Sequence, residues 1–586
     1  MNERPPVNRE LIARVPAFRI AISVMLIGCL FALPARTLAA DPVRPVDRPV
    51  SPFGIGPCSM RSQCFPTWIP QMVEIGVTDV RCFGGSWGCE PEQGKFNWKV
   101  TDERLDYLES QNVHAGALLM GRRPKWLTNG TSRLPPSGLP LDCLPEWSNY
   151  VSNMVAHTKG RVKYFEVWNE PPNGTKNAPP SDYAKVMVAS YDAAKSSNPD
   201  ALVGLATKSV YLYYLDAAIK AGAKGHYDYI TLHPYEVLGT VASHPGTEPL
   251  FLTIASKVRK MLAAQDPAKV NVPIFFTEIG YDAKRSAAKQ AQALVKTYTM
   301  GIAQGIACIQ WFEGRDGDSG PMGLMDAKGN KRPSYTALSV MIRYLGKYPR
   351  YLGWVLLNDK HYAFVFQGAN GVVLITWAAT ATPDEVEFDS GVEYINPQID
   401  QIVKAFKVPL TADPIIIEKG VPDKLVAQAK ANKTKPFPWG GDYTDAKSVS
   451  VTMGAKNVEK GLHTLSADSI AADVVLYGGN ARAGNVPGGN AFLVDPNFLS
   501  YDTVPVEITA VVRRNEQNDP FKLTLQYEST SGYKDAKPYD IPDNQEWHKA
   551  TWRIDDPQFV ASWAFDFRIN SGKYCIQSVT VTKLAK

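Results

Sequence analysis

Residues 164–171 read Tyr-Phe-Glu-Val-Trp-Asn-Glu-Pro, and this stretch decides how the rest of the chain is interpreted. Its aromatic and β-branched residues are typical of a buried strand. Because a proline cannot donate to a strand ladder, Pro171 predicts that the strand ends by presenting Asn169 and Glu170. An acid at the end of a buried strand is uncommon unless it is paired or functional.

A second strand of the same kind also ends in a glutamate. Residues 272–281 read Val-Pro-Ile-Phe-Phe-Thr-Glu-Ile-Gly-Tyr, which predicts a buried strand that delivers Glu278. Double-displacement glycoside hydrolysis needs two carboxylates, one to protonate the leaving oxygen and one to attack the anomeric carbon. We therefore expect Glu170 to be the general acid/base, with a raised pKa, and Glu278 to be the ionised nucleophile. The alternative is two unrelated surface glutamates.

The two motifs resemble those of the clan A retaining glycoside hydrolases. The motifs are Trp-Asn-Glu-Pro at 168–171 and Thr-Glu-Ile-Gly-Tyr at 277–281, and they look closest to the β-xylosidase-like glycoside hydrolase family 39 and its neighbours in family 5. In that clan the Asn-Glu pair ends barrel strand four and the second Glu ends strand seven. The resemblance covers residues 53–346 and extends to residues 445–586 with less force.

Residues 53–346 alternate short apolar runs with helical stretches, with helices expected at 65–77, through Leu105 and Leu108, and at 333–345. The strands are expected at 53–59, 77–83, 113–119, 162–170, 202–206, 229–235, 272–281 and 307–313. Apolar strands that alternate with helices indicate a parallel sheet covered by helices, and eight such units fit a (β/α)₈ TIM barrel. In that fold the active site lies at the C-terminal strand ends, where all the candidate residues lie.

After the barrel the apolar pattern changes to a period of two. Residues 347–420 indicate a small accessory β domain, and residues 421–444, with Pro and Gly among lysines, indicate a linker. Residues 445–586 alternate again and predict an antiparallel β-sandwich that looks like a carbohydrate-binding jelly roll.

Several aromatic residues of the sandwich have two interpretations. Three of them could stack on sugar rings, although filling the sandwich core is the favoured reading: Tyr533, Trp547 and Trp552. A strand over 563–569 is expected to place four apolar residues on one face: Trp563, Phe565, Phe567 and Ile569.

Two residues beside the glutamates are expected to support them. The resemblance implies that Asn169 binds the sugar 2-hydroxyl, and the alternative is an Asn that caps the turn. By period two, Glu166 and Trp168 share the side of Glu170, so Glu166 points into the barrel and needs a cation. Arg81, which ends the second strand, is the expected cation. In the clan an Arg there also supports the nucleophile, and the alternative is a plain buried ion pair.

The sixth and eighth strands end in further candidates. His233 and Tyr235 end strand six, and a similar step in the clan orients the nucleophile through the tyrosine hydroxyl. The alternative for His233 is a satisfied core histidine. Trp311 ends strand eight and offers a flat apolar face to the sugar at the cleavage point, or else packs in the barrel. Glu313 could contact sugar hydroxyls.

Two departures from the clan pattern concern the substrate. The loops after strands two and three match fewer hydroxyl contacts than the resemblance to family 39 β-xylosidases implies. Family 5 members usually carry a His near the end of strand three, and residues 115–120 contain none, which leans toward family 39 or a minor branch. The loop with Trp87, Cys89 and Trp98, and residues 122–126, are expected to shape the binding subsites. The sugar they prefer cannot be inferred from these residues.

The N-terminus indicates export. An apolar run over 20–33 follows four arginines and precedes small residues up to Ala40, which is typical of a signal peptide over residues 1–40. The run is shorter than the ~20 residues that span a bilayer, so a membrane anchor is the weaker alternative, and we expect no stable membrane insertion after signal removal. Lipoprotein processing at Cys29 is another alternative. Residues 41–52 are expected to be an extended linker, and the mature protein to be secreted or periplasmic.

The cysteines that remain after signal removal favour disulfides in an exported protein. Four of them lie close together, and Cys58–Cys64 and Cys82–Cys89 are the expected pairs. The eight histidines are scattered, so no metal site is expected. No metal or organic cofactor is expected either, because the two carboxylates supply both acid and nucleophile.

The charge pattern points to no polyanionic partner. The net charge of +5 falls to about +2 without residues 1–40, and no basic block interleaves with aromatic residues as on a nucleic-acid surface. We therefore expect a carbohydrate substrate and no nucleic-acid partner. The function expected from the sequence is a retaining β-glycosidase that acts on a poly- or oligosaccharide. The alternatives are a non-catalytic carbohydrate-binding protein on a barrel scaffold and a transglycosylase.

Overall fold

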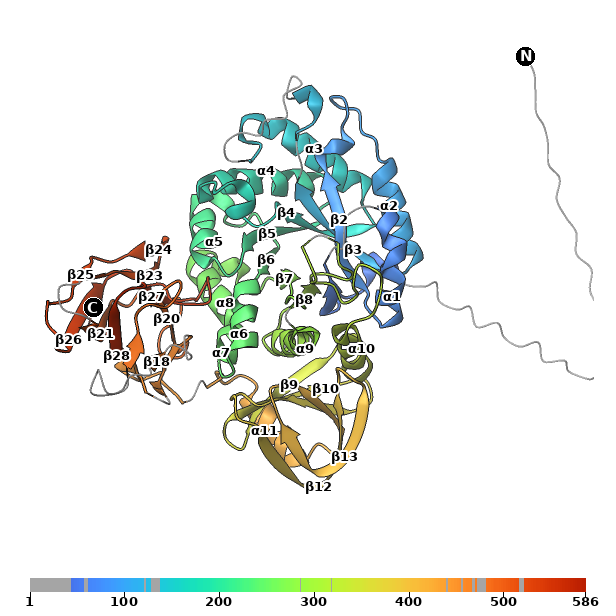
Figure 1. Cartoon of the computed structure of the whole chain (residues 1–586). Coiled ribbons are helices and arrows are strands. Elements are labelled where there is room, and N and C mark those ends of the chain that lie inside the picture. Colours follow the sequence, from blue (N-terminus) through green and yellow to red (C-terminus); the bar gives the residue numbers. More distant parts are fainter. Residues whose placement is uncertain are drawn as a thin grey trace, which may run out of the picture. The chain divides into compact units, whose positions relative to one another are not determined.

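Eight parallel strands close into a barrel whose strands follow one another in sequence order (Figure 1). The strands are β1 Phe53–Ile55, β2 Asp79–Ser86, β3 His114–Met120, β4 Val162–Val167, β5 Leu202–Lys208, β6 Tyr229–His233, β7 Ile274–Ile279 and β8 Cys308–Trp311. β1 closes the ring by pairing with β8, with Phe53 opposite Ile309. The predicted (β/α)₈ TIM barrel is therefore confirmed, although most predicted strands were too long.

The computed structural model describes most of the chain. It covers residues 44–56, 62–120, 123–127, 138–284, 286–317, 319–438, 441–454, 457–465, 470–471, 481–515 and 521–585. The predicted signal peptide, part of the segment 122–126 and Cys58 lie outside these ranges. In the part of the chain that is described, no helix has both the length and the apolar character needed to cross a bilayer.

Helices surround the barrel. They are α1 Ile69–Glu74, α2 Lys99–Ser110, α3 Leu144–His157, α4 Pro180–Ser197, α5 Leu212–Ala218, α6 Tyr235–Ser243, α7 Glu248–Leu252, α8 Ile254–Gln265, α9 Ala287–Ala303 and α10 Pro333–Leu345. α10 has the predicted bounds, because Pro333 suits a first helical position and Gly346, with φ 74°, ends the helix. α1 is shorter than predicted, because a separate 3₁₀ turn over Ser62–Thr67 precedes it.

The alternation of side chains breaks where β4 ends. Trp168 and Glu170 both have left-handed backbone conformations, with φ of 66° and 49°. As a result Trp168 turns away from the barrel axis: its ring lies 5.9 Å from that of Trp147, and its indole donates to the carbonyl of Gly174 at 3.0 Å. The expectation that Trp168 shares the side of Glu166 is wrong, because period two ends with the strand at Val167.

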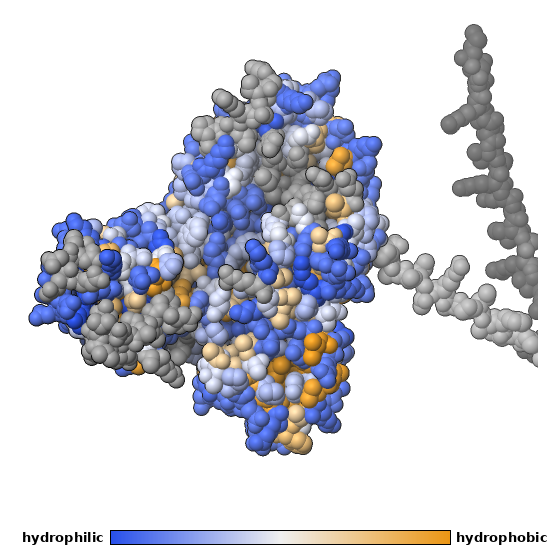
Figure 2. Space-filling model, viewed as in Figure 1, coloured by the Kyte–Doolittle hydropathy of each residue, from blue (hydrophilic) through white to orange (hydrophobic). Residues whose placement is uncertain are grey.

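A six-stranded antiparallel sheet follows the barrel, with strand order β13-β12-β14-β11-β10-β9. Its strands are β9 Arg350–Leu357, β10 His361–Gln367, β11 Val372–Thr376, β12 Asp384–Asn396, β13 Gln401–Leu410 and β14 Ile415–Lys419. Hydrophobic residues are visible on the surface of this part of the chain (Figure 2), and the exposed ones include Ile399, Ile402 and Phe406 around β13.

A helix, α11 Asp423–Asn432, packs against β9. The Asn432 amide donates to the carbonyl of Trp354 at 3.1 Å. The helix lies so close that a Cβ on Gly353 would stand 1.7 Å from the carbonyl oxygen of Ala429. The segment predicted as a linker, 421–444, therefore contains a packed helix over residues 423–432, because apolar residues such as Val426 and Ala429 give this stretch a face to bury.

Two antiparallel sheets make up the C-terminal part, as predicted. One is built on β15 Ser448–Thr452, β16 Val458–Lys460, β18 Ile470–Ala471, β19 Ala481–Ala483, β21 Val506–Arg514, β26 His548–Ile554 and β28 Tyr574–Lys583. The other contains β17 Leu462–Thr464, β20 Asn490–Val494, β23 Leu525–Ser529, β24 Gly532–Asp535 and β27 Phe567–Ile569. A short pair, β22 Lys522–Leu523 and β25 Tyr539–Asp540, lies beside them. Residues 44–586 form one compact unit, and the predicted domain limits inside it stay predictions.

The aromatic residues of this sandwich differ in their surroundings. Trp552 is buried in the core, as the favoured reading expected, whereas Tyr533 and Trp547 are only partly buried. The predicted strand over 563–569 begins only at Phe567. Trp563 lies before it in a turn and is 45% exposed, so the expectation that it shares a strand face with Phe567 is wrong.

Five cysteines whose side chains are described are free thiols. They include Cys64 and Cys89, so neither of the two predicted disulfides is formed. Proximity in sequence misled the prediction, because β2 continues to Ser86 and advances about 3.3 Å per residue away from Cys82. A disulfide needs Cα atoms within about 7 Å of each other.

Candidate active site

Six of the seven predicted site residues meet at the C-terminal ends of the barrel strands. Arg81 comes from β2, Asn169 and Glu170 follow β4, His233 ends β6, Tyr235 begins α6, and Glu278 lies near the end of β7. Five of them lie at the edge of the barrel that carries the active site in TIM-barrel enzymes. The expectation that Arg81 ends its strand is wrong, because β2 continues to Ser86, and only its guanidinium reaches Asn169 and Glu278. The seventh residue, Trp311, does not join them.

Arg81 connects three of the other polar groups. It is 3% exposed, and its Nε donates to Oε2 of Glu166 at 2.8 Å. Its Nη1 donates to Glu278, and its Nη2 donates to Oδ1 of Asn169 at 2.9 Å. Burial opposes its charge, but the two carboxylates raise the pKa of Arg81 above its usual range. The expected pairing of Arg81 with Glu166 is confirmed, and one planar guanidinium fixes three side chains at once.

Glu166 is a buried carboxylate with all its contacts made inside the barrel. Its Oε1 accepts hydrogen bonds from the hydroxyls of Thr231 at 2.8 Å and Thr277 at 3.0 Å. Burial raises its pKa, but Arg81, His233 and Thr231 together lower the pKa of Glu166 to about 2. Glu166 is thus ionised, both its oxygens already accept hydrogen bonds, and it positions the residues that donate them.

His233 lies between the two candidate catalytic carboxylates. Its Nδ1 is 3.0 Å from Oε1 of Glu170 and 3.6 Å from Oε2 of Glu278, and its Nε2 is 3.0 Å from the hydroxyl of Thr277. Burial disfavours the charged ring, but the negative charge of Glu278, the nearby Glu166 carboxylate and the hydrogen bond to Glu170 raise the pKa of His233 to about 9. The ring therefore carries a positive charge at neutral pH.

Glu170 differs from the expectation in its acidity. Burial raises its pKa, but the hydrogen bond and charge of His233, with the charges of Lys208 and Arg81, lower the pKa of Glu170 below its ordinary value. The expected raised pKa is therefore wrong for the free protein, because three cations surround this carboxyl group. Its side chain is 23% exposed, so a ligand can reach it.

Glu278 faces Glu170 across a short gap. The Tyr235 hydroxyl donates to Oε2 of Glu278 at 3.4 Å, and Arg81 donates to its Oε1. One carboxylate oxygen of Glu170, one of Glu278 and a ring nitrogen of His233 all lie within 4.8 Å of one another. The two carboxylates are thus close enough to act on the two sides of one bond.

The same three side chains are the one group of potential metal ligands found in the described part of the chain. Metal ligands must be deprotonated, and His233, with its pKa of about 9, holds its proton at neutral pH. Arg81 already supplies a positive charge to Glu278. Glu170, His233 and Glu278 therefore suit an uncharged ligand better than a metal cation.

Trp311 was predicted in the site, and that prediction is wrong. Cys308 and Gln310 line the barrel interior, so alternation along β8 turns Trp311 outward, where it is completely buried. The next residue, Phe312, lies near the site instead, with its ring edge-on to Tyr235 at 6.5 Å. Glu313 is also completely buried and accepts a hydrogen bond from the backbone of Gly317, so it cannot contact a sugar.

The loop expected to shape subsites packs inward instead. Trp87 is 1% exposed, stacks on Tyr150, and donates to Glu90 at 2.9 Å. Trp98 stacks on His157 at the end of α3. In the segment 122–126, Arg123 pairs with Asp142. These aromatic residues support the fold beside the barrel.

Three polar residues of the site were missed in the sequence. Thr231 and Thr277 face the interior of neighbouring strands β6 and β7, and their alternation with apolar residues was the available signal. Lys208, the last residue of β5, lies in register with His233, and its Nζ is 3.7 Å from Oε1 of Glu236. An isolated lysine after an apolar strand gives no distinctive pattern.

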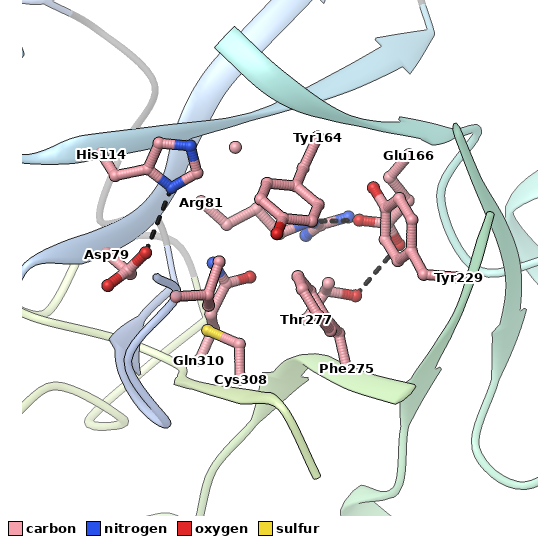
Figure 3. A pocket seen from close by; sticks show the side chains of 12 residues that line it. Asp79, Arg81, His114, Tyr164, Glu166, Tyr229, Phe275, Thr277, Cys308 and Gln310 are labelled. Carbon is pink, nitrogen blue, oxygen red and sulfur yellow. Dashed lines mark hydrogen bonds and ion pairs between the residues drawn. The ribbon is translucent and has the colours of Figure 1, made fainter. Parts of the chain in front are cut away.

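A small cavity of about 20 Å³ lies inside the barrel, lined by side chains of several strands (Figure 3). Asp79, His114 and Tyr229 line it from the starts of their strands, and Arg81 and Glu166 border it. His114 is bound to Asp79 at 3.1 Å. The cavity holds no more than a water-sized molecule, so it is too small to admit a sugar ring.

Comparisons with known proteins bear on the fold. No family model matches the chain, and no curated protein does. A family 39 glycoside hydrolase from the gut symbiont Bacteroides cellulosilyticus WH2 is 19% identical, with a TM-score of 0.51, over 63% of this chain and 81% of that one. A glucosidase from Croceicoccus marinus is 12% identical, with a TM-score of 0.44, over 92% of this chain and 96% of that one. At such identity the first likeness shows that the chain shares the TIM-barrel fold.

Proposed function

We propose that the chain is a retaining β-glycosidase that hydrolyses O-glycosidic bonds of a poly- or oligosaccharide. The observation that carries the proposal is the approach of Glu170 and Glu278 to within 4.8 Å at the C-terminal strand ends. Retaining enzymes hold their carboxyl groups ~5–5.5 Å apart, whereas inverting enzymes need ~6.5–9.5 Å to admit a water molecule. The short gap favours direct attack by a carboxylate.

In the first step Glu278 attacks the anomeric carbon of the sugar. A bond forms between a Glu278 oxygen and that carbon while the bond to the leaving oxygen breaks. Arg81 and Tyr235 both donate to Glu278, which orients it for the attack. Glu170 gives a proton to the leaving oxygen in the same step.

The proton for the leaving group is held beside Glu170. His233 is positively charged at neutral pH, and its Nδ1 lies 3.0 Å from Oε1 of Glu170. We therefore treat the two side chains as one acid that shares a proton, which passes from the ring to the carboxyl group as the leaving oxygen gains charge. This arrangement reconciles an acid role for Glu170 with its lowered pKa.

In the second step water attacks the anomeric carbon of the covalent intermediate. Glu170 removes a proton from the water, the new carbon–oxygen bond forms, and the bond to Glu278 breaks. The amide of Asn169 is fixed because Arg81 binds its Oδ1, which leaves the Nδ2 group free to donate to a sugar hydroxyl. Two displacements return the anomeric configuration of the substrate.

Labelling with a 2-fluoro glycoside tests the proposal. The fluorine slows the second step, so the covalent intermediate should accumulate on Glu278 and appear in the peptide that contains it by mass spectrometry. Proton NMR of the first product should show retained configuration. Label on another residue, or an inverted product, would contradict the mechanism.

A further inference from the structure

Trp563 stands out among the tryptophans of the chain. Of those described, it is the exposed one, at 45%, although it belongs to the sandwich and sits in a turn between strands. A large exposed aromatic side chain is common at binding surfaces, where its flat face contacts a ligand. Its place in the fold therefore calls for an explanation.

The turn that carries Trp563 is docked onto the barrel. The Ser209 hydroxyl donates to the carbonyl of Ser562 at 2.5 Å, and the Ser562 hydroxyl donates to the carbonyl of Val210 at 2.9 Å. The buried ammonium of Lys257 donates to the carbonyl of Val560 at 3.1 Å. Ser209 and Val210 directly follow β5, so the turn rests on the loop at the C-terminal end of that strand.

The turn is also rigid before any ligand arrives. The buried carboxylate of Glu528 accepts hydrogen bonds from the backbone of Val560, Ala561 and Ser562 at 2.9, 2.8 and 3.2 Å. The backbone of Trp563 itself donates to the Tyr533 hydroxyl at 3.1 Å. An aromatic side chain on a fixed backbone loses little freedom when a ligand binds, so it makes an efficient contact surface.

Lys208 joins Trp563 to the catalytic acid. Its Nζ lies 5.4 Å from the centre of the Trp563 ring. The backbone of Lys208 donates to the carbonyl of Pro171 at 3.0 Å, and the Thr207 hydroxyl donates to the same carbonyl at 2.8 Å. Pro171 immediately follows Glu170 in the sequence, so Trp563 lies on the Glu170 side of the site.

The ammonium group of Lys208, which lies near Trp563, and the carboxylate of Glu236 can both form further hydrogen bonds. Lys208 and Glu236 are 3.7 Å apart, which is too long for a hydrogen bond. The side chains of Lys208 and Glu236 are each 22% exposed, so a ligand can reach them. An aromatic face with a nearby ammonium and carboxylate matches a sugar, which presents C–H groups on one side and hydroxyls around its edge.

We infer that Trp563 is the sugar platform on the leaving-group side of the site, with Lys208 and Glu236 as the partners of that sugar's hydroxyls. The inference rests on the proposed function, in which Glu170 protonates the leaving oxygen and therefore faces the leaving group. It makes the C-terminal sandwich a part of the substrate site, and it favours substrates whose leaving group is itself a sugar.

The test compares two substrates that share one sugar and differ in the leaving group. Xylobiose and cellobiose have a sugar as leaving group, whereas β-xylosyl and β-glucosyl fluoride have none. For the full chain, Trp563→Ala should lower the ratio of kcat/KM for the disaccharide to that for the fluoride by roughly tenfold, the scale of one aromatic contact. Trp563→Phe should restore much of the ratio. A ratio equal to that of the wild type would overturn the inference.

A matched control and a binding measurement distinguish failure of the inference about Trp563 from failure of the proposed function. Trp547→Ala removes a partly buried tryptophan that contacts Arg513 within the sandwich, and it should keep the wild-type ratio. If the wild type cleaves no substrate, the proposed function fails, and binding of the same disaccharides by NMR decides about Trp563. Weaker binding by Trp563→Ala than by Trp547→Ala supports the platform, whereas equal binding, or none by the wild type, overturns it.

Discussion

The Nδ1 atom of His233 lies 3.0 Å from Oε1 of Glu170, so the candidate acid touches a buried imidazolium. The positive charge of His233 stabilises the ionised form of Glu170, so Glu170 holds its own proton weakly. The pair, and not Glu170 alone, sets the pH range in which a proton is available for the leaving group.

The alkaline limit of activity should follow from this contact. Because the pKa of His233 is raised to about 9, the pair loses its shared proton above that pH, and kcat/KM should fall there. His233→Asn should move the limit to lower pH and reduce the rate. The half-buried His226, which contacts the carbonyl of Lys224, provides the control variant His226→Asn, and an equal shift in that variant would contradict the assignment.

The stability contributed by His233 should also depend on pH, with a definite sign. Its pKa is about 9 in the folded chain and about 6.5 when unfolded, so the folded state binds the proton more tightly. The contribution is complete below pH 6.5 and is lost as pH rises through 9. By linkage it amounts to about 3 kcal/mol. Denaturant unfolding of the wild type and His233→Asn at pH 6 and pH 10 should show the difference in unfolding free energy shrink at pH 10.

Glu170→Gln should affect substrates according to their leaving groups. Loss of general acid–base catalysis costs about 10²–10⁴ in rate, and poor leaving groups depend on it most. Hydrolysis of alkyl β-glycosides should therefore fall far more than that of glycosyl fluorides. Added azide should restore turnover and yield a β-glycosyl azide, detected by NMR. An α-glycosyl azide, or equal losses on all substrates, would contradict the role of Glu170.

Arg81→Met should destabilise the fold and abolish activity. It leaves Glu166 buried without its cation, and breaking a buried ion pair in this way costs about 3–5 kcal/mol. Adding Glu166→Gln removes the unpaired charge, so the double variant should recover part of the unfolding free energy. It should recover no activity, because Glu278 and Asn169 still lack their partner. A double variant no more stable than Arg81→Met would contradict this account.

The packing of α11 on β9 gives a prediction with a built-in control. Gly353 has φ 147°, and a Cβ there would overlap the carbonyl of Ala429. Gly371 has φ 153° and no atom within 4 Å of the same position. Both Ala variants bear the same backbone strain, so the extra loss in Gly353→Ala measures the steric overlap, which we expect at about 1–3 kcal/mol. Equal losses in thermal or denaturant unfolding would show that α11 does not pack there.

The fold could be predicted because its signals are local and repeated. Buried parallel strands appear as uninterrupted apolar runs, and eight of them alternating with helices left few other arrangements. Glu170 and Glu278 could be found for the same reason, since an acid that ends such a run is conspicuous. The contact of Arg81 with Glu166 followed from charge balance, because a carboxylate inside a barrel needs a partner.

The wrong predictions share one cause. Each concerns contacts or register between different elements, which the sequence of a single strand does not determine. Trp311 and Phe312 are neighbours in sequence, and only the register of β8 decides which of them faces the site. The lowered pKa of Glu170 depends on Lys208 and His233, which come from other strands. The position of Trp563 depends on how the sandwich docks, and no local pattern in the sequence encodes that contact.

The burial of Lys257 has a consequence for how this chain can be cut or recombined. Its ammonium group, 3% exposed, ends on a carbonyl that belongs to the sandwich. A barrel produced without the sandwich would lose that acceptor. The surfaces of α5 and α8 that contact the sandwich would then be exposed to water. If engineering or evolution replaced the C-terminal region, the residues on the barrel surface that contact it would therefore have to change as well.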